Sequence, residues 1–262
     1  MHAVPDVRPD AHAPAARRHP LLRARLLEAK YEFLGLLRTP IFALPTLLFP
    51  AMFYLLFGVA MNRGGGAGQY LLATYGVFGV MGAALFGFGV TVAMDRDQGL
   101  LALKRALPVP PGAYLASKMA MALLFSAIVS LLLAVIAATL VGVSLAPAQW
   151  LLLWAVHVAG ALPFCALGLY VGTLASGAAA PVVVNLLYLP MAFLSGLWLP
   201  LSMLPDALAR LAPAWPSYHH AQLALKVVGM DARQAVALHL GVLLAVTFGF
   251  FVLARARLAR RG

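Results

Sequence analysis

The sequence predicts an all-α integral membrane protein with six transmembrane helices. Hydrophobic residues make up 63% of its 262 residues, and charged residues only 10%, whereas about 25% charged residues is usual for a soluble domain. The hydrophobic residues gather in runs of about 20, the length at which a helix crosses the hydrocarbon core of a bilayer. Water therefore cannot be the solvent for most of the surface.

The chain is predicted to form a single transmembrane domain over residues 17–257, with a disordered tail at 1–16 and a short cytoplasmic tail at 258–262. Residues 17–38 carry apolar side chains at three- and four-residue spacing with basic residues between them. This pattern is typical of an amphipathic helix lying at the membrane interface. An ordinary helix packed against the bundle remains an alternative.

The six spans follow in order, and none of them contains a carboxylate. Pro45 and Pro50 predict a kink in the first span, Pro163 lies near the middle of the fourth, and the second is rich in glycine. The predicted spans cover residues 41–61, 70–94, 116–140, 150–174, 178–199 and 235–254.

Basic residues predict the orientation of these spans. Six spans place both termini on one side, and 15 of the 19 Lys and Arg residues fall in the N-terminal segment, the loop 95–118 and the C-terminal tail. Cytoplasmic segments carry the excess of basic residues. We therefore expect a bacterial inner-membrane protein with both termini in the cytoplasm, and attraction of its basic segments to anionic membrane lipids.

Two connecting segments are longer than simple turns. The predicted cytoplasmic loop 95–118 contains a short amphipathic helix over Arg96–Leu107, which ends at a run of prolines. The external segment 200–234 is rich in proline and in aromatic residues, which favour membrane interfaces. It is predicted to form short re-entrant helices between spans five and six.

The residues offer no catalytic or cofactor chemistry of their own. The chain lacks the phosphate-binding G-x-x-x-x-G-K-[ST] loop, so any ATP would be bound by a partner subunit, and no basic stripe with interleaved aromatics indicates nucleic acid. His219 and His220 lack companion ligands for a metal site, and His157 is interpreted as a hydrogen-bonded residue of the bundle interior. We expect no catalytic, cofactor or metal residues, and hence no enzyme.

Three segments resemble the permeases of type-2 ATP-binding-cassette (ABC) exporters. The segment Phe193–Pro200 resembles the end of span five in that family, and Ala212–His219 resembles the loop before its last span. The segment Asp95–Leu101 is similar to the family's acidic-x-Gly segment after span two, with Asp97 in place of Glu and Leu100 in place of Thr.

The resemblance implies a dimer of permeases, identical or related, in which each copy binds a cytosolic ATPase subunit. The helix that begins at Arg96 would dock on the ATPase and couple ATP hydrolysis to transport. The residues implied in this coupling are Asp95, Arg96, Asp97, Gly99, Leu100 and Leu103. The residues proposed for the substrate path or the external gate are Asn185, Tyr188, Ser195, Gly196, Trp198 and Pro200.

Other functions remain possible on the sequence alone. The missing carboxylates count against a secondary transporter driven by an ion gradient, but do not exclude one, or a channel. A subunit that only anchors or assembles other proteins is a third reading. The substrate could be a drug-like molecule, a lipid or a saccharide.

Overall fold

A computed structural model gives the fold, and it describes residues 27, 30, 31, 34, 35, 40–61, 66–100, 103 and 113–261. The predicted tail at 1–16 lies outside these residues, as does most of the predicted interfacial helix at 17–38. Of the predicted helix Arg96–Leu107, only residues 96–100 and 103 are described. Every regular element within the described ranges is helical.

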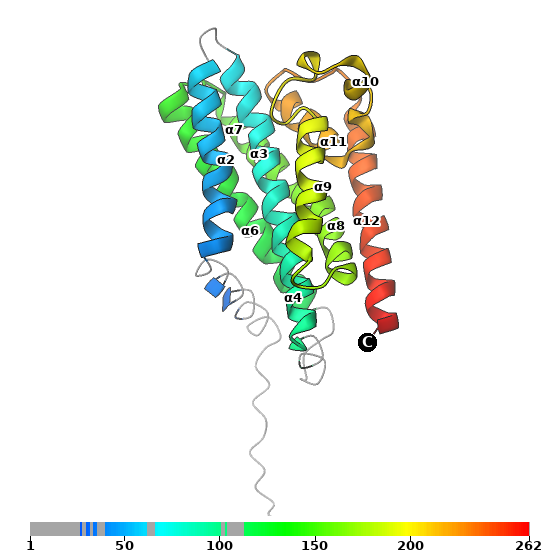
Figure 1. Ribbon diagram of the computed structural model, residues 1–262. Coiled ribbons are helices and arrows are strands. Elements are labelled where there is room, and N and C mark those ends of the chain that lie inside the picture. The colour runs from blue at the N-terminus through cyan, green and yellow to red at the C-terminus, as the bar shows by residue number, and fades with distance from the viewer. Residues whose placement is uncertain are drawn as a thin grey trace, which may run out of the picture.

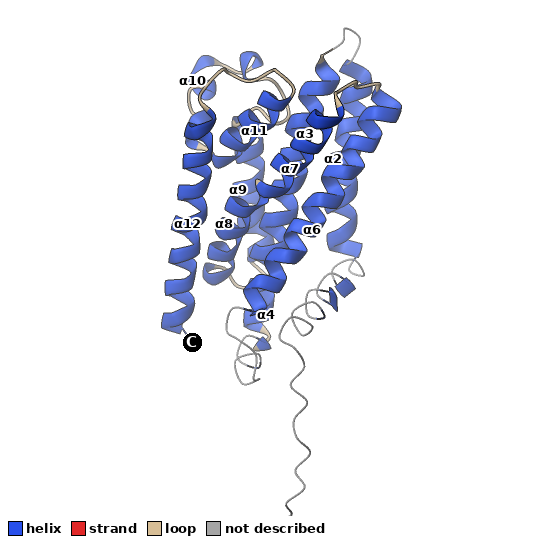
Figure 2. Ribbon diagram, turned by 180° about the vertical axis from the view of Figure 1, so that it is seen from behind, coloured by secondary structure: helices blue, strands red, loops and turns tan. Residues whose placement is uncertain are grey.

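The described chain forms a bundle of long, roughly antiparallel helices, seen from opposite sides in Figures 1 and 2. Its first half contains α2 (Pro40–Met61), α3 (Ala67–Leu85), the π-helical turn η1 (Phe86–Val90), α4 (Thr91–Asp97), α6 (Ala113–Ile136) and the π-helical turn η2 (Ala137–Val141). Its second half contains α7 (Pro147–Ala159), α8 (Ala161–Leu174), α9 (Ala180–Leu194), η3 (Leu201–Met203), α10 (Asp206–Ala209), η4 (Ala212–Ala214), α11 (Pro216–Val227) and α12 (Val236–Arg261).

The two ends of the bundle differ in structure. One end holds α4, the loop between α8 and α9, and the last turn of α12, and we call it the α4 end (Figure 1). The opposite end holds the short helices η3, α10 and η4 together with α11, and we call it the α10 end. The predicted short helices between spans five and six are therefore present as helices.

The prediction of a multi-pass membrane protein is confirmed in its coarse form. Four helical segments among the described residues are long and apolar enough to cross a bilayer: Ala67–Asp97, Tyr114–Val141, Pro147–Leu174 and Val236–Leu258. Two shorter apolar helical segments, Thr46–Val59 and Ala180–Leu194, accompany them. The number of six spans stays a prediction.

Several predicted boundaries differ from the observed helices. The span predicted at 178–199 is a helix only from Ala180 to Leu194, because Gly196 adopts a left-handed φ of +76° and turns the chain. The last helix does not stop at Ala254, but continues to Arg261 through the predicted tail. The fourth span breaks at Gly160, where Pro163 has no N–H to continue the backbone ladder.

Helix α3 forms the centre of the bundle, and its glycines admit side chains from the surrounding helices. Residues Leu71–Leu85 are all buried. A Cβ placed on the α3 glycines would meet His157 of α7 at Gly76, Val129 of α6 and Pro50 of α2 at Gly79, and Tyr188 of α9 at Gly82. Together the three glycines admit side chains from four neighbouring helices, because Gly79 receives two of them.

Another close contact between backbones joins η1, which directly follows α3, to α8. Gly89 faces Gly168 and Gly172, which are four residues apart on α8: a Cβ on Gly172 would lie 2.9 Å from the carbonyl oxygen of Gly89, and a Cβ on Gly168 3.1 Å from its nitrogen. Small residues at this spacing allow two helices to meet backbone to backbone. The hydroxyl of Thr91 donates to the carbonyl of Gly87 in the same turn.

Candidate functional site

The α4 end carries the polar residues that the sequence associates with coupling. The guanidinium of Arg96 reaches across to the end of α8, where Nη1 donates to the carbonyl of Gly172 (2.9 Å) and Nη2 to that of Ala175 (2.7 Å). The last carbonyls of a helix have no partners within the helix, and they attract cations. Arg96 therefore caps α8 from the neighbouring helix.

Asp97 extends this contact into the loop that joins α8 to α9. The backbone N–H of Gly177 donates to Asp97 Oδ2 at 2.6 Å, while Asp97 Oδ1 lies 3.2 Å from Nη2 of Arg96. A Cβ at Gly177 would lie 3.1 Å from the Cα of Met94, so any larger residue would push the loop away by a few tenths of an ångström. The two side chains together fix the start of α9 relative to α4.

Asp95 points the other way and ties α4 to the beginning of α6. Its Oδ2 lies 2.9 Å from Nζ of Lys118 and accepts a hydrogen bond from the Tyr114 hydroxyl at 2.7 Å. The side chain of Lys118 is only 3% exposed. A buried cation of this kind needs its partner, because an unpaired charge away from water is costly.

Lys118 was assigned from the sequence to the polar loop 95–118, and that assignment was wrong. The residue is buried inside α6, two residues after the start predicted for span three. Asp95 directly follows the predicted second span, and Lys118 lies at the start of the predicted third span. This pair of opposite charges at adjoining span ends could have indicated the contact.

The helix ends immediately after this polar group. Gly99 has a φ of +73°, and its N–H donates to the Arg96 carbonyl at 3.0 Å, which closes α4 with a left-handed turn. A second helical turn starts at once, since the Leu103 N–H donates to the Gly99 carbonyl at 3.1 Å. Leu100 is half-buried, whereas Leu103 is 59% exposed. An exposed leucine thus lies directly beyond a firmly fastened helix end.

The residues predicted for the substrate path separate into one exposed and several buried positions. Asn185 is exposed on α9, and its Nδ2 donates to the Pro181 carbonyl of its own helix at 3.1 Å. Tyr188 is buried instead: its hydroxyl donates to the Phe78 carbonyl at 3.1 Å and its ring stacks on Phe78 with the centroids 4.8 Å apart. Tyr188 therefore fastens α9 to α3.

The turn after α9 is fastened from two sides. The hydroxyls of Ser195 and Ser217 lie 2.5 Å apart, and Ser217 Oγ also donates to the Met191 carbonyl at 3.2 Å. On the other side, the Tyr70 hydroxyl of α3 donates to the carbonyl of Gly196 at 2.7 Å. The sequence predicted Ser195 and Gly196 as site residues, but it gave no sign of Ser217 as their partner.

Trp198 and Pro200 complete this turn at the α10 end. The indole of Trp198 packs among Phe53, Phe78 and Phe193, with ring centroids 5.7–6.4 Å apart. Pro200 borders a small apolar hollow of about 220 Å³ that also touches Tyr70. The six predicted path residues therefore line the length of α9 and its following turn, without enclosing a single cavity.

The histidines within the described residues are hydrogen-bonded inside the bundle. His157 Nδ1 lies 2.8 Å from Ser130 Oγ and its Nε2 lies 3.0 Å from the Ala73 carbonyl, as interpreted from the sequence. His219 shares a hydrogen bond with His239 of α12, with the two Nδ1 atoms 2.9 Å apart. In the part of the chain that is described, no group of three or more His, Cys, Asp or Glu residues could hold a metal ion.

Comparison with known proteins supplies the remaining evidence. The family model described as ABC-2 type transporter matches residues 26–228. The chain is also 29% identical over 204 residues to a protein of Bacillus subtilis (strain 168) that carries the provisional name transport permease YvfS, a match that covers 75% of this chain and 82% of the relative.

Proposed function

Because the chain belongs to the ABC-2 type transporter family, we propose that it is the transmembrane permease subunit of an exporter driven by a separate ATPase. The sequence contains no phosphate-binding loop of its own. Conformational changes driven by ATP in the partner must then be transmitted to the membrane helices through protein contacts. The provisional name of the Bacillus relative, a transport permease, supports the transport part of this proposal.

The observation that carries the proposal is the polar network at the α4 end. Arg96 and Asp97 bind the end of α8 and the loop that leads to α9, while Asp95 binds Lys118 of α6. A displacement applied just beyond Gly99 is therefore passed to three helices at once. Rigid elements joined by such contacts move together when a domain rearranges.

In this proposal the segment beyond Gly99 docks on the ATPase. The exposed Leu103 supplies an apolar contact there, and Leu100 braces the turn against the bundle. ATP binding would displace this segment, α4 would follow, and the loop 175–179 would carry the movement into α9. The turn Ser195–Pro200 at the far end of α9 would then act as the external gate.

The proposed arrangement in the membrane has six spans, with α2 and α9 as the two additional ones. The α4 end would face the cytoplasm of a bacterial cell, because among the described residues it carries Arg96, Lys118 and the basic last turns of α12, whereas the α10 end carries Arg210, Lys226 and Arg233. A second permease copy, identical or related, completes the pathway across the inner membrane. The short helices between α9 and α12 would then dip into the outer face of the bilayer.

The substrate class remains broad in this proposal: a drug-like molecule, a lipid or a saccharide. Asn185 is a polar residue exposed on an otherwise apolar stretch of α9, which favours a path along this helix. Replacing Asn185 by Leu would test that path, because transport would fall while assembly is kept.

Two glycines offer a matched test of coupling. Gly99 and Gly229 both have a left-handed φ, of +73° and +74°, and both donate their N–H to a carbonyl three residues earlier. A Cβ added to either glycine would meet no other atom within 4 Å, but Gly99 lies at the α4 end and Gly229 at the α10 end. Proline at either position removes the same hydrogen bond and the same turn.

The experiment begins with purification of the tagged chain from its native membrane in mild detergent, followed by mass spectrometry. We expect a soluble ATPase with a phosphate-binding loop to accompany the chain. Gly99→Pro should assemble in the membrane and lose coupled ATP hydrolysis, whereas Gly229→Pro should keep it. Full coupling in Gly99→Pro, or repeated purification without any ATPase, would contradict the proposal and favour an ion-driven transporter.

A further inference from the structure

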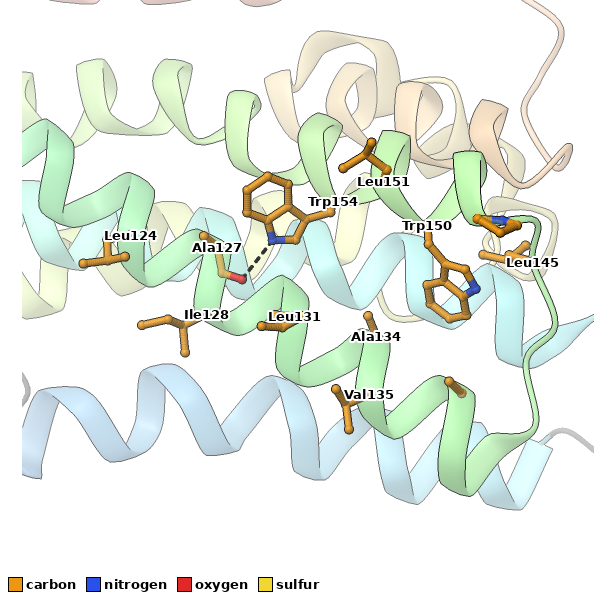
Figure 3. A pocket seen from close by; sticks show the side chains of 12 residues that line it. Leu124, Ala127, Ile128, Leu131, Ala134, Val135, Leu145, Trp150, Leu151 and Trp154 are labelled. Atoms are coloured by element: carbon orange, nitrogen blue, oxygen red, sulfur yellow. Dashed lines mark hydrogen bonds between the residues drawn. The ribbon is translucent and has the colours of Figure 1, made fainter.

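An open apolar groove runs between α6 and α7, on a side of the bundle remote from α9 (Figures 2 and 3). Its volume is about 990 Å³, at the upper end of the range of about 300–1,000 Å³ in which proteins bind small molecules. None of the residues assigned above to coupling or to the transport path contributes to it.

The surface of the groove is almost entirely hydrocarbon. Leucine, isoleucine, valine, alanine, proline and tryptophan side chains line it, and Figure 3 shows Trp150 and Trp154 lying across the space between the two helices. The indole N–H of Trp154 donates to the Ala127 carbonyl of α6 at 3.2 Å, so its polar atom is directed away from a ligand. An occupant must therefore be apolar along its length.

The groove is long enough for a lipid chain. Its walls on α6 and η2 extend from Leu124 to Ala138, and 14 residues of helix at 1.5 Å each correspond to about 21 Å. One leaflet contributes about 15 Å to the hydrocarbon core of a bilayer. Both helices belong to segments able to cross the membrane, and Trp150 stands near the α10 end, where an indole suits the interface with the headgroups.

We propose that this groove binds the acyl chains of a phospholipid of the surrounding bilayer. A third helix is the other conceivable occupant, but close helix packing in membranes needs small residues along the contact. Alanines also line the groove, but bulky side chains project between them: Leu131 is 58% exposed, Val135 52% and Leu151 67%. Thin flexible chains can pass between such projections, whereas a helix would be held away from them.

A pair of alanines allows the groove to be filled without touching the core. Ala134 and Ala138 line the groove and are not buried, so Ala134→Leu with Ala138→Leu adds methyl groups to the open space. Ala245→Leu on the exposed face of α12 is the matched control. Each variant is purified in detergent, washed extensively, and weighed with its retained lipid by native mass spectrometry.

We expect the original chain and Ala245→Leu to retain phospholipid, and the filled variant to retain about tenfold less, because each methylene displaced from apolar contact weakens binding. Equal retention in all three proteins would overturn the proposal, and so would a copurified polypeptide that the filled variant loses instead of lipid.

A second measurement does not depend on the folding of the filled variant. With Trp198 and Trp215 replaced by phenylalanine, Trp150 and Trp154 are the remaining tryptophans. In bilayers containing phosphatidylcholine with brominated chains, their fluorescence should be quenched, and washed protein in detergent should keep that quenching. Recovery of full fluorescence as soon as the bilayer is dissolved would also overturn the proposal.

Discussion

The contact between Gly172 and η1 gives a prediction whose magnitude follows from the structure. In Gly172→Ala the new Cβ would lie 2.9 Å from the Gly89 carbonyl oxygen and 3.1 Å from Cβ of Val92. Contacts this short force α8 away from η1, because the first atom is backbone held in a helical turn. Overpacking of this kind costs about 1–3 kcal/mol of unfolding free energy.

A glycine elsewhere separates this cost from the intrinsic effect of alanine. Gly249 lies in α12 and has no atom within 4 Å of its Cβ position. Alanine favours a helix over glycine by about 1 kcal/mol, so Gly249→Ala should stabilise the protein by that amount. The same gain applies to Gly172→Ala, and the difference between the two variants is therefore the steric cost of about 1–3 kcal/mol.

The chain contains its own reporter for this comparison. Cys165 is the single cysteine, and it is buried on α8 two turns before Gly172. A fluorophore that reacts with thiols labels it when the bundle opens on heating. We expect the midpoint of Gly172→Ala to lie about 2–12 °C below that of Gly249→Ala. A midpoint equal to or above that of Gly249→Ala would refute the close packing of α8 on η1.

Three further predictions also use thermal midpoints, and the measurements in acid are read by circular dichroism because only a thiolate reacts with the fluorophore. Arg96→Ala should lower the free energy of unfolding by about 2 kcal/mol, since two carbonyls lose a charged donor. Arg96→Lys should restore only part of this loss, because one ammonium group cannot reproduce the two hydrogen bonds of the guanidinium. Full stability in Arg96→Ala would disprove the cap. Tyr188→Phe should cost about 1 kcal/mol for the lost bond to Phe78, and Tyr188→Ala about 3–5 kcal/mol; equal midpoints for the two variants would count against the stacking. Burial by itself would raise the pKa of Asp231, but the hydrogen bond and charge of Lys226 hold that pKa below its usual value. The ionised Asp231 therefore stabilises the fold fully above about pH 4, and this contribution is lost as the pH falls through the pKa of Asp231 in the folded protein. The midpoints of the original chain and Asp231→Asn should differ at neutral pH and converge in acid.

The sequence predicted the elements of the bundle better than their ends. Hydropathy identifies long spans because the bilayer sets one length for all of them, and the helices at 67–97, 113–141, 147–174 and 236–261 lie close to the predicted positions. The end of α9 was missed because Leu197 and Trp198 are as apolar as the helix before them. The turn is held by hydrogen bonds from Tyr70 to the Gly196 carbonyl and between Ser195 and Ser217, and local sequence does not reveal these partners.

The role of the candidate site stays a prediction, and the sequence does not reveal its contacts. The helix predicted over Arg96–Leu107 was wrong at its start, because α4 ends at Asp97 and Gly99 turns the chain with a left-handed φ of +73°. The partners of Arg96 are carbonyls about 80 residues away, and a carbonyl has no signature in the sequence. Spacing could have indicated one partner surface, since Gly168 and Gly172 form a small-xxx-small pair.

The glycines of α3 bear on how such a bundle can move. Small residues on the second span could in principle allow helices to slide past one another. In the fold each of these positions is filled by a bulky side chain, and His157 and Tyr188 are in addition hydrogen-bonded to α3 carbonyls. Sliding by one residue would drive an imidazole or a phenol into a neighbouring side chain. The interior therefore favours rigid-body movement of α3 with α7 and α9, and a displacement received at the α4 end would reach the turn after α9 undiminished.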